Sequence, residues 1–236
     1  MNFKHAGKMG DVIFSLPAIS TLGGGSLYLL ENPEVEFFTR NIEILLPLLH
    51  KQDCITEVIL GTSPKEPYTD LSIIFKDYES IRGNLVDNCL EKLSLPPFSV
   101  HQQFLKCGKK ELSGIKVVVC VTPRYRTDVQ WSSVLEPHLA SAIYLGTVSE
   151  YHRFKRDFSI DLPFYPTADL LEAAEIINGV ELFIGNQGAL HSIAEGLKKN
   201  IMLAIHNSDC HFDRPGVKHL TNTWLCKPYS SILQTI

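Results

Sequence analysis

A turn near the start of the chain places a carboxylate where it could act as a base. Gly7 and Gly10 flank the turn, and Asp11 opens an apolar helical stretch. Because Gly10 lacks a side chain, the backbone can come close to a ligand there. The helix dipole favours the ionised form of an acid at this position, and such a carboxylate could accept a proton from a bound hydroxyl. The position equally suits an acid that only caps the helix, so both roles stay open.

A second candidate is a glycine-containing loop between an expected strand and an expected helix. Its polar and small residues are Asn186, Gln187, Gly188, Ala189 and His191. Backbone N–H groups at such a helix start bind phosphate with help from the helix dipole. The pattern is neither a Walker A loop nor G-x-G-x-x-G, which counts against kinases and dehydrogenases. His191 is either a core histidine or a donor to a phosphate oxygen.

Two more loops offer groups for a nucleotide. Arg124 and Arg126 follow an expected strand and could clamp a diphosphate. Glu150 follows another, and an acid at that place commonly bonds the ribose hydroxyls in nucleotide-binding folds. The alternatives are solvent-exposed charges, with Trp131 packed against the sheet.

A group of His and Asp residues near the C-terminus has loosely metal-like spacing. Its members are His206, Asp209, His211 and Asp213. The spacing matches no zinc template, and a polar loop after a strand accounts for it. We therefore predict no metal site.

The elements that must position these loops follow from the apolar pattern. Short apolar runs alternate with helical patterns, and runs of this kind suit strands buried on both faces of a parallel sheet. The expected strands cover residues 27–30, 56–60, 71–75, 115–121, 142–145, 181–184 and 201–205, and the expected helices cover residues 170–177 and 189–199. This alternation predicts an α/β fold with mostly parallel sheets.

A polar, basic and glycine-containing segment, residues 106–114, precedes the most apolar of the expected strands. We interpret it as a linker between an N-terminal domain, residues 1–112, and a C-terminal domain, residues 113–236. Two such Rossmann-like halves would face each other across a cleft, and ligands favour the carboxyl ends of their strands. One continuous sheet with a long loop is the alternative.

Composition and charge restrict the expected localisation and the expected classes of binding partner. The chain has 236 residues, 44% of them apolar, and a formal net charge of -4, so no global basic field attracts nucleic acid or anionic lipid. Six cysteines without a C-x-x-C pair favour a reducing compartment. The N-terminus lacks the apolar core of a signal peptide, and the longest apolar stretch, residues 42–49, is too short to span a bilayer. We expect a cytoplasmic protein whose contact with membranes, if any, is peripheral.

Taken in order, these segments resemble glycosyltransferase family 9, the lipopolysaccharide heptosyltransferase-like group with a GT-B fold. Residues 10–19 fit the family's G-D-V-I-x-x-L-P-A-L segment almost residue for residue. Residues 185–197 look like its G-N-D-S-G-P-x-H-x-A-A-A-L-G segment with one residue missing. Residues 124–131 are similar to its arginine-, lysine- and tryptophan-containing loop, and residues 146–150 to its ribose-binding G-x-x-x-E.

The resemblance implies two Rossmann-like domains and a metal-independent, inverting transfer of a sugar from a nucleotide-activated donor to an unidentified acceptor hydroxyl. It implies no cofactor, and the chain contains no D-x-D triplet of the kind that holds a metal and a diphosphate in another group of glycosyltransferases. Asp11 would be the general base. The residues implied on the donor side are Gly10, Arg124, Arg126, Glu150, Asn186, Gln187, Gly188, Ala189 and His191.

The chain also departs from the family pattern. Gln187 stands where the family has an Asp-Ser pair, and Val129 stands where it has a lysine. The N-terminal half, to which the resemblance assigns the acceptor, is shorter than usual for the family. These departures leave open a catalytically silent nucleotide-sugar-binding protein, or a nucleotide-sugar epimerase on the same fold. Nucleic acid would enter only as an acceptor, which the negative charge disfavours.

Overall fold

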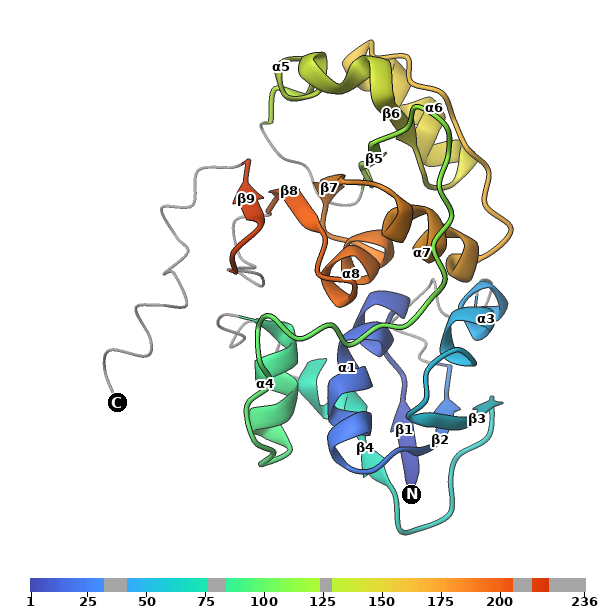
Figure 1. Ribbon diagram of the computed structural model, residues 1–236. Helices are drawn as coiled ribbons and strands as arrows, with labels where there is room; N and C mark the ends of the chain where they lie inside the picture. The colour runs from blue at the N-terminus through green and yellow to red at the C-terminus, as the bar shows by residue number, and fades with distance from the viewer. Residues whose placement is uncertain (32–41, 76–83, 124–128, 206–213, 221–236) are drawn as a thin grey trace.

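Two parallel sheets organise the computed structural model, which describes residues 1–31, 42–75, 84–123, 129–205 and 214–220 (Figure 1). The first sheet has the strand order β3-β2-β1-β4, and the second has the order β6-β5-β7-β8-β9. All strand pairs in both sheets are parallel. The strands are β1 (Asn2–His5), β2 (Gly25–Leu29), β3 (Ile55–Leu60), β4 (Thr69–Asp70), β5 (Val117–Cys120), β6 (Ala142–Tyr144), β7 (Leu182–Asn186), β8 (Asn200–Ala204) and β9 (Val217–His219).

Helices connect these strands, which confirms the predicted α/β class with parallel sheets. The α-helices are α1 (Met9–Thr21), α3 (Leu46–Leu49), α4 (Leu85–Lys92), α5 (Trp131–Leu135), α6 (Val148–Phe158), α7 (Leu170–Gly179) and α8 (Ala189–Gly196). The 3-10 helices are η1 (Ile42–Ile44), η2 (Leu71–Phe75) and η4 (Glu136–Ser141). Among the described residues, no helix combines the length and the hydropathy needed to cross a membrane.

The second sheet carries helices on both faces. Val117 and Val119 of β5 pack with Trp131 of α5 and Phe154 of α6. Val118 points to the opposite face, since side chains alternate along a strand, and joins the core that contains α7 and α8. Burial on both faces explains why this strand is a continuous apolar run in the sequence.

The first sheet packs mainly through one face. Phe3 and Leu27 are fully buried and belong to the same core as side chains of α1 and α3. Lys4 and Tyr28 point the other way and are half-buried. The prediction that the strand around Leu27 is buried on both faces is therefore wrong at Tyr28, because only the face toward α1 takes part in the apolar core.

The apolar core continues from the first sheet to the second, through the contact between α1 and α8 (Figure 1). The segment that crosses between the sheets is bound on both sides. Gln52 exchanges two hydrogen bonds of 2.9 Å with the backbone of Lys106, and the carbonyl oxygen of Gly196 accepts from the backbone N–H groups of Phe104 and Leu105. Leu105 is fully buried between these anchors. The division of the chain at residue 112 stays a prediction.

Two predicted elements differ from the structure. Residues 71–75 form the 3-10 helix η2 instead of a strand, because the Asp70 carboxylate accepts the backbone N–H of Ser72 at 2.9 Å and turns the chain. The helix predicted over residues 189–199 ends at Gly196. Lys198 then takes the left-handed conformation with φ of 55°, which turns the chain toward β8.

A buried ion pair ties α8 to the start of β9. Glu195 is fully buried, and its carboxylate accepts from Arg214 Nε at 2.8 Å and from Lys198 Nζ at 2.6 Å. Arg214 also donates to the carbonyl oxygen of Lys199 at 2.8 Å. Because charges inside a protein are costly unless they are paired, these groups must stay together.

We predict that Glu195→Gln lowers the free energy of unfolding by about 3 kcal/mol, because it leaves the Arg214 guanidinium buried beside a neutral amide. Urea unfolding at neutral pH measures the loss. The exposed Asp157, which pairs with Arg153 and Arg156 on α6, supplies the control. Asp157→Asn should cost less than about 0.5 kcal/mol, and an equal cost for the two variants would show that the buried pair contributes no more than a surface pair.

Candidate functional site

The predicted functional loops leave the two sheets at the places where the strand order reverses. In the first sheet this place lies between β1 and β4, and in the second between β5 and β7. Ligands of open α/β sheets bind outside the carboxyl ends of the strands at such switch points. The loop after β1 leads to Asp11, the loop after β5 leads to Arg124, and the loop after β7 leads to Gly188. Three of the predicted functional loops therefore lie at the switch points, where ligands of this kind of fold bind.

The start of α1 meets the start of α8. A Cβ atom placed on Gly10 would lie 2.8 Å from Ser192 Oγ and 3.8 Å from both Ala189 Cα and the Gly188 carbonyl oxygen. Behind this contact, the rings of Phe14 and His191 pack with their centroids 6.3 Å apart. The residue before the predicted base thus touches the predicted phosphate-binding turn, although about 180 residues separate them along the chain.

Asp11 lies in the first turn of α1 and is half-buried. Its Oδ2 atom accepts the backbone N–H of Lys8 at 3.0 Å. This bond has the geometry of a helix cap, so the structure supports the structural role that the sequence left open. A carboxylate has several acceptor positions, so a cap and a catalytic role do not exclude each other at this residue.

The start of α8 presents backbone N–H groups. Gly188 precedes the helix and is exposed, and no side chain of the described residues caps it by a hydrogen bond. Ser192 instead donates to the Gly188 carbonyl oxygen, from its backbone N–H at 3.0 Å and from its hydroxyl at 3.1 Å. N–H groups in the first turn of a helix have no intrahelical acceptor, so this turn can receive an anion.

Asn186 holds the root of the arginine loop. Its Oδ1 atom accepts the backbone N–H of Thr122 at 2.8 Å, and its Nδ2 atom donates to the Thr122 carbonyl oxygen at 2.7 Å. The Tyr144 hydroxyl donates to the neighbouring Val121 carbonyl oxygen at 2.9 Å. These bonds fix the chain two residues before Arg124, beside Gly188. Arg124 and Arg126 themselves lie outside the described residues.

Glu150 lies at the carboxyl end of β6, in the first turn of α6. Its Oε2 atom accepts the backbone N–H of Thr147 at 2.8 Å, and its own backbone N–H donates to Thr147 Oγ1 at 3.2 Å, which forms a capping box. Gly146 has φ of +149°, and a Cβ there would approach Glu150 Oε2 to 3.2 Å. Glycine therefore lets the loop fold over this carboxylate. Its contact with a ribose stays a prediction.

Three of the predicted donor-side residues are buried: Asn186, whose amide binds the Thr122 backbone, Gln187 and His191. His191 is 1% exposed and Gln187 is 6% exposed, so these two side chains lie beneath the turn whose backbone is open at Gly188. Their contact with a donor stays a prediction. Sequence reasoning did not single out Ser192, which the structure places against Gly10. Helical spacing could have identified Ser192, because it follows Gly188 by four residues and therefore lies on the same side of α8.

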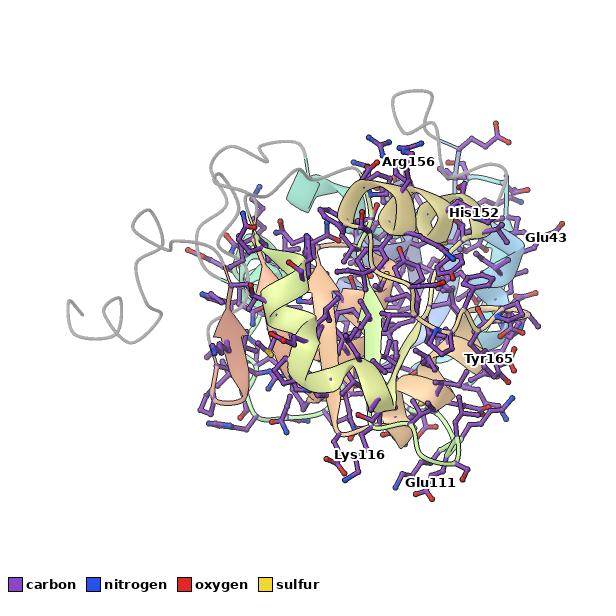
Figure 2. All side chains as sticks on the ribbon, turned by 90° about the horizontal axis from the view of Figure 1, so that it is seen from above. Glu43, Glu111, Lys116, His152, Arg156 and Tyr165 are labelled. Atoms are coloured by element: carbon purple, nitrogen blue, oxygen red, sulfur yellow. The ribbon has the colours of Figure 1, made fainter. Side chains whose placement is uncertain are left out.

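The described residues support neither a metal cluster nor an unpaired basic patch on α6. Among its described residues, no three His, Cys, Asp or Glu side chains are placed to hold a metal ion, and the His and Asp group of residues 206–213 lies outside that part. On α6, Arg156 projects outward at one side of the molecule (Figure 2), but it pairs with Asp157. Lys155 pairs with Asp161 at 2.6 Å. These ion pairs cancel the local positive charge that phosphate binding would need.

The fold matches solved structures of glycosyltransferases. The E. coli heptosyltransferase WaaC with ADP matches with a TM-score of 0.62 at 10% identity, over 99% of this chain and 98% of that chain. The same enzyme with ADP-2-deoxy-2-fluoro heptose gives a TM-score of 0.59 at 11% identity, over 93% and 92%. A family 9 glycosyl transferase from Veillonella parvula gives 0.61 at 9% identity, over 94% and 86%. No protein-family model and no curated protein match the sequence.

These matches confirm the predicted resemblance at the level of the fold. The two parallel sheets with flanking helices correspond to the GT-B structures across nearly the full length of the chain. Because a fold can serve many chemistries, function must be argued from the residues of the site.

We predict that Gly10→Ala destabilises the protein by about 1–3 kcal/mol, because the added methyl group meets the Ser192 hydroxyl. Replacing glycine by alanine in a helix is otherwise stabilising. The double variant Gly10→Ala/Ser192→Ala removes the clashing oxygen and should regain most of the loss. Thermal unfolding of the two single variants and the double variant measures the coupling. Additive effects would show that α1 and α8 do not meet at these residues.

We predict a pH dependence of stability from His5. Burial lowers the pKa of this imidazole from 6.5 to about 4, against smaller opposite effects of the Asp11 backbone and the Asp70 charge. Between pH 6.5 and about pH 4, His5 is therefore protonated in the unfolded chain but neutral in the folded chain. The free energy of unfolding is therefore unaffected by His5 titration above about pH 6.5. It falls by about 3 kcal/mol in total as the pH is lowered toward 4.

Urea unfolding of wild type and His5→Asn at intervals between pH 7 and pH 4 tests this. The difference between the two proteins should fall with pH, because other titrating groups contribute equally to both. Parallel profiles would contradict the assignment of this pH dependence to His5.

Proposed function

We propose that this protein is a metal-independent, inverting glycosyltransferase that moves a sugar from a nucleotide-diphosphate donor to an acceptor hydroxyl. One observation carries the proposal. Gly10, the neighbour of Asp11, packs directly against Gly188, Ala189 and Ser192 at the start of α8. A base and an anion-binding turn on opposite sides of one contact are what a displacement at a sugar carbon needs.

Asp11 acts on the acceptor in this proposal. The acceptor oxygen attacks the anomeric carbon of the sugar, and its proton passes to the Asp11 carboxylate. The bond between the anomeric carbon and the diphosphate oxygen breaks as the new carbon–oxygen bond forms, so the configuration inverts. The hydrogen bond from the Lys8 backbone to Oδ2 orients the carboxylate.

The departing diphosphate is received by α8. The first-turn N–H groups of Ala189 and Leu190 and the positive end of the helix dipole stabilise the negative charge that develops on the leaving oxygen. Arg124 and Arg126 supply cations from the loop that Asn186 anchors beside Gly188. These groups take the place of a metal, in agreement with a chain that lacks a D-x-D triplet.

An adenine nucleotide sugar is the first donor to test. Two of the matching structures contain ADP or ADP-2-deoxy-2-fluoro heptose. Both match more than nine-tenths of this chain. In the proposed complex, the ribose lies toward Glu150 at the end of β6, and the diphosphate lies at Gly188. ADP should therefore raise the melting temperature of the protein, because it binds the native state alone.

We predict that Asp11→Asn reduces turnover of ADP-heptose by about 100-fold or more, with ADP binding unchanged, because the amide cannot accept the proton. Without an acceptor, slow hydrolysis with water as the nucleophile serves as the assay, and release of ADP is measured. If ADP-heptose is inert, the same assay is run with UDP-, GDP-, CMP- and TDP-sugars. Binding is followed by thermal shift.

Asp157→Asn is the matched control, because it removes an exposed carboxylate from the last turn of α6 without touching either switch point. It should keep full turnover. Full turnover in Asp11→Asn would exclude the proposed base. Binding without turnover of any donor would identify a silent nucleotide-sugar-binding protein, and an isomerised donor without an acceptor would identify an epimerase.

A further inference from the structure

A buried histidine lies directly beneath the turn that carries Asp11. His5 is the last residue of β1, and its side chain is fully buried on the inner face of the sheet, the same face as Phe3. A histidine in an apolar core is costly to bury unless its ring makes polar contacts. Its contacts therefore show what it does there.

The first contact fixes the beginning of the turn. The backbone N–H of Gly7 donates to His5 Nδ1 at 2.9 Å. A side-chain acceptor that binds the N–H two residues ahead closes the same ring as an Asx turn. Nδ1 must be unprotonated to accept this bond, which agrees with the low pKa of about 4 that burial gives the ring. The neutral ring is therefore a fixed acceptor at neutral pH.

The second contact reaches the end of the turn. The Asp11 backbone lies close enough to raise the pKa of the same ring, against the larger effect of burial. A Cβ atom on Gly7 would lie 2.5 Å from His5 Cε1 and 3.2 Å from Asp11 Cβ. The imidazole, the Gly7 backbone and the base of the Asp11 side chain thus stack without space for another atom.

We propose that His5 is a positioning residue for Asp11. Its ring binds the Gly7 backbone at one end of the turn and packs with Gly7 against the base of the Asp11 side chain at the other. It thereby sets the position of the Asp11 carboxylate. The catalytic part of this inference rests on the proposed function, since it treats Asp11 as the base. The positioning itself is a property of the turn and can be measured without any substrate.

Two backbone amides report on the two ends of this arrangement. The Gly7 N–H donates to His5, whereas the Lys8 N–H donates to the Asp11 carboxylate at 3.0 Å. Loss of the His5 ring removes the partner of Gly7 directly. It weakens the partner of Lys8 only if the ring holds Asp11 in place. Hydrogen exchange at Lys8 therefore separates positioning from simple filling of the core.

Three variants make the test. His5→Leu keeps an apolar body and removes the acceptor for the Gly7 N–H. His5→Asn keeps an acceptor two residues before Gly7, as in an Asx turn. Phe3→Leu is the control, because it disturbs the same buried face of β1 two residues away without touching the turn.

In His5→Leu, amide exchange should quicken by about 10-fold or more at both Gly7 and Lys8, whereas Phe3→Leu should leave both amides near wild type relative to its global stability. His5→Asn should restore most of the protection. With a donor that the wild type turns over, His5→Leu should lower kcat by about 10- to 100-fold with little change in KM, and His5→Asn should recover most of it.

Several outcomes would overturn the inference. Faster exchange at Gly7 but not at Lys8 would show that the ring holds the turn without holding Asp11. Equal loss of kcat in His5→Leu and Phe3→Leu, after matching for stability, would reduce His5 to a core residue. If His5→Leu does not fold, nitrogen NMR of the wild type decides, since a proton on Nδ1 of His5 contradicts the contact with Gly7. If no donor is turned over, the proposed function fails, and exchange at Lys8 alone decides the positioning.

Discussion

The close approach of two helix starts at Gly10 is the constraint on which the rest of the site depends. α1 and α8 meet there without a side chain between them, and the space that a methyl group would fill is taken by the Ser192 hydroxyl. That hydroxyl donates to the Gly188 carbonyl oxygen. In the proposed mechanism, this contact lets an acid from one half of the chain and an anion-binding turn from the other act on one ligand.

Buried polar groups hold each side of this contact in place. Beneath α1, His5 binds the Gly7 backbone and sets the turn that leads to Asp11. Beside α8, Asn186 binds both backbone groups of Thr122 and sets the root of the arginine loop. At the far end of α8, Glu195 pairs with Arg214. Each of these groups is costly to bury, and each repays the cost by directing backbone rather than by adding apolar contact.

Fold and chemistry rest on different observations in this protein. At identities of 9–11%, the solved glycosyltransferases share the arrangement of two parallel sheets and little of the sequence. The proposed chemistry rests on residues at the two switch points, where Gly10, the neighbour of Asp11, lies against the start of α8.

The sequence by itself determined the elements and the loops that carry chemistry, because apolar runs and glycine turns are local signals. The buried strand around Val118, the turn before Asp11 and the loop at Gly188 could all be predicted from neighbouring residues. Only the tertiary structure decided that Gly10 touches Ser192, that Asn186 serves Thr122, and that residues 71–75 leave the strand at Asp70. The first two join residues more than 60 positions apart, so no local pattern contains them. The third is a short-range turn at Asp70, but the carboxylate that makes it also pairs with Lys4 of β1, which is distant in the sequence.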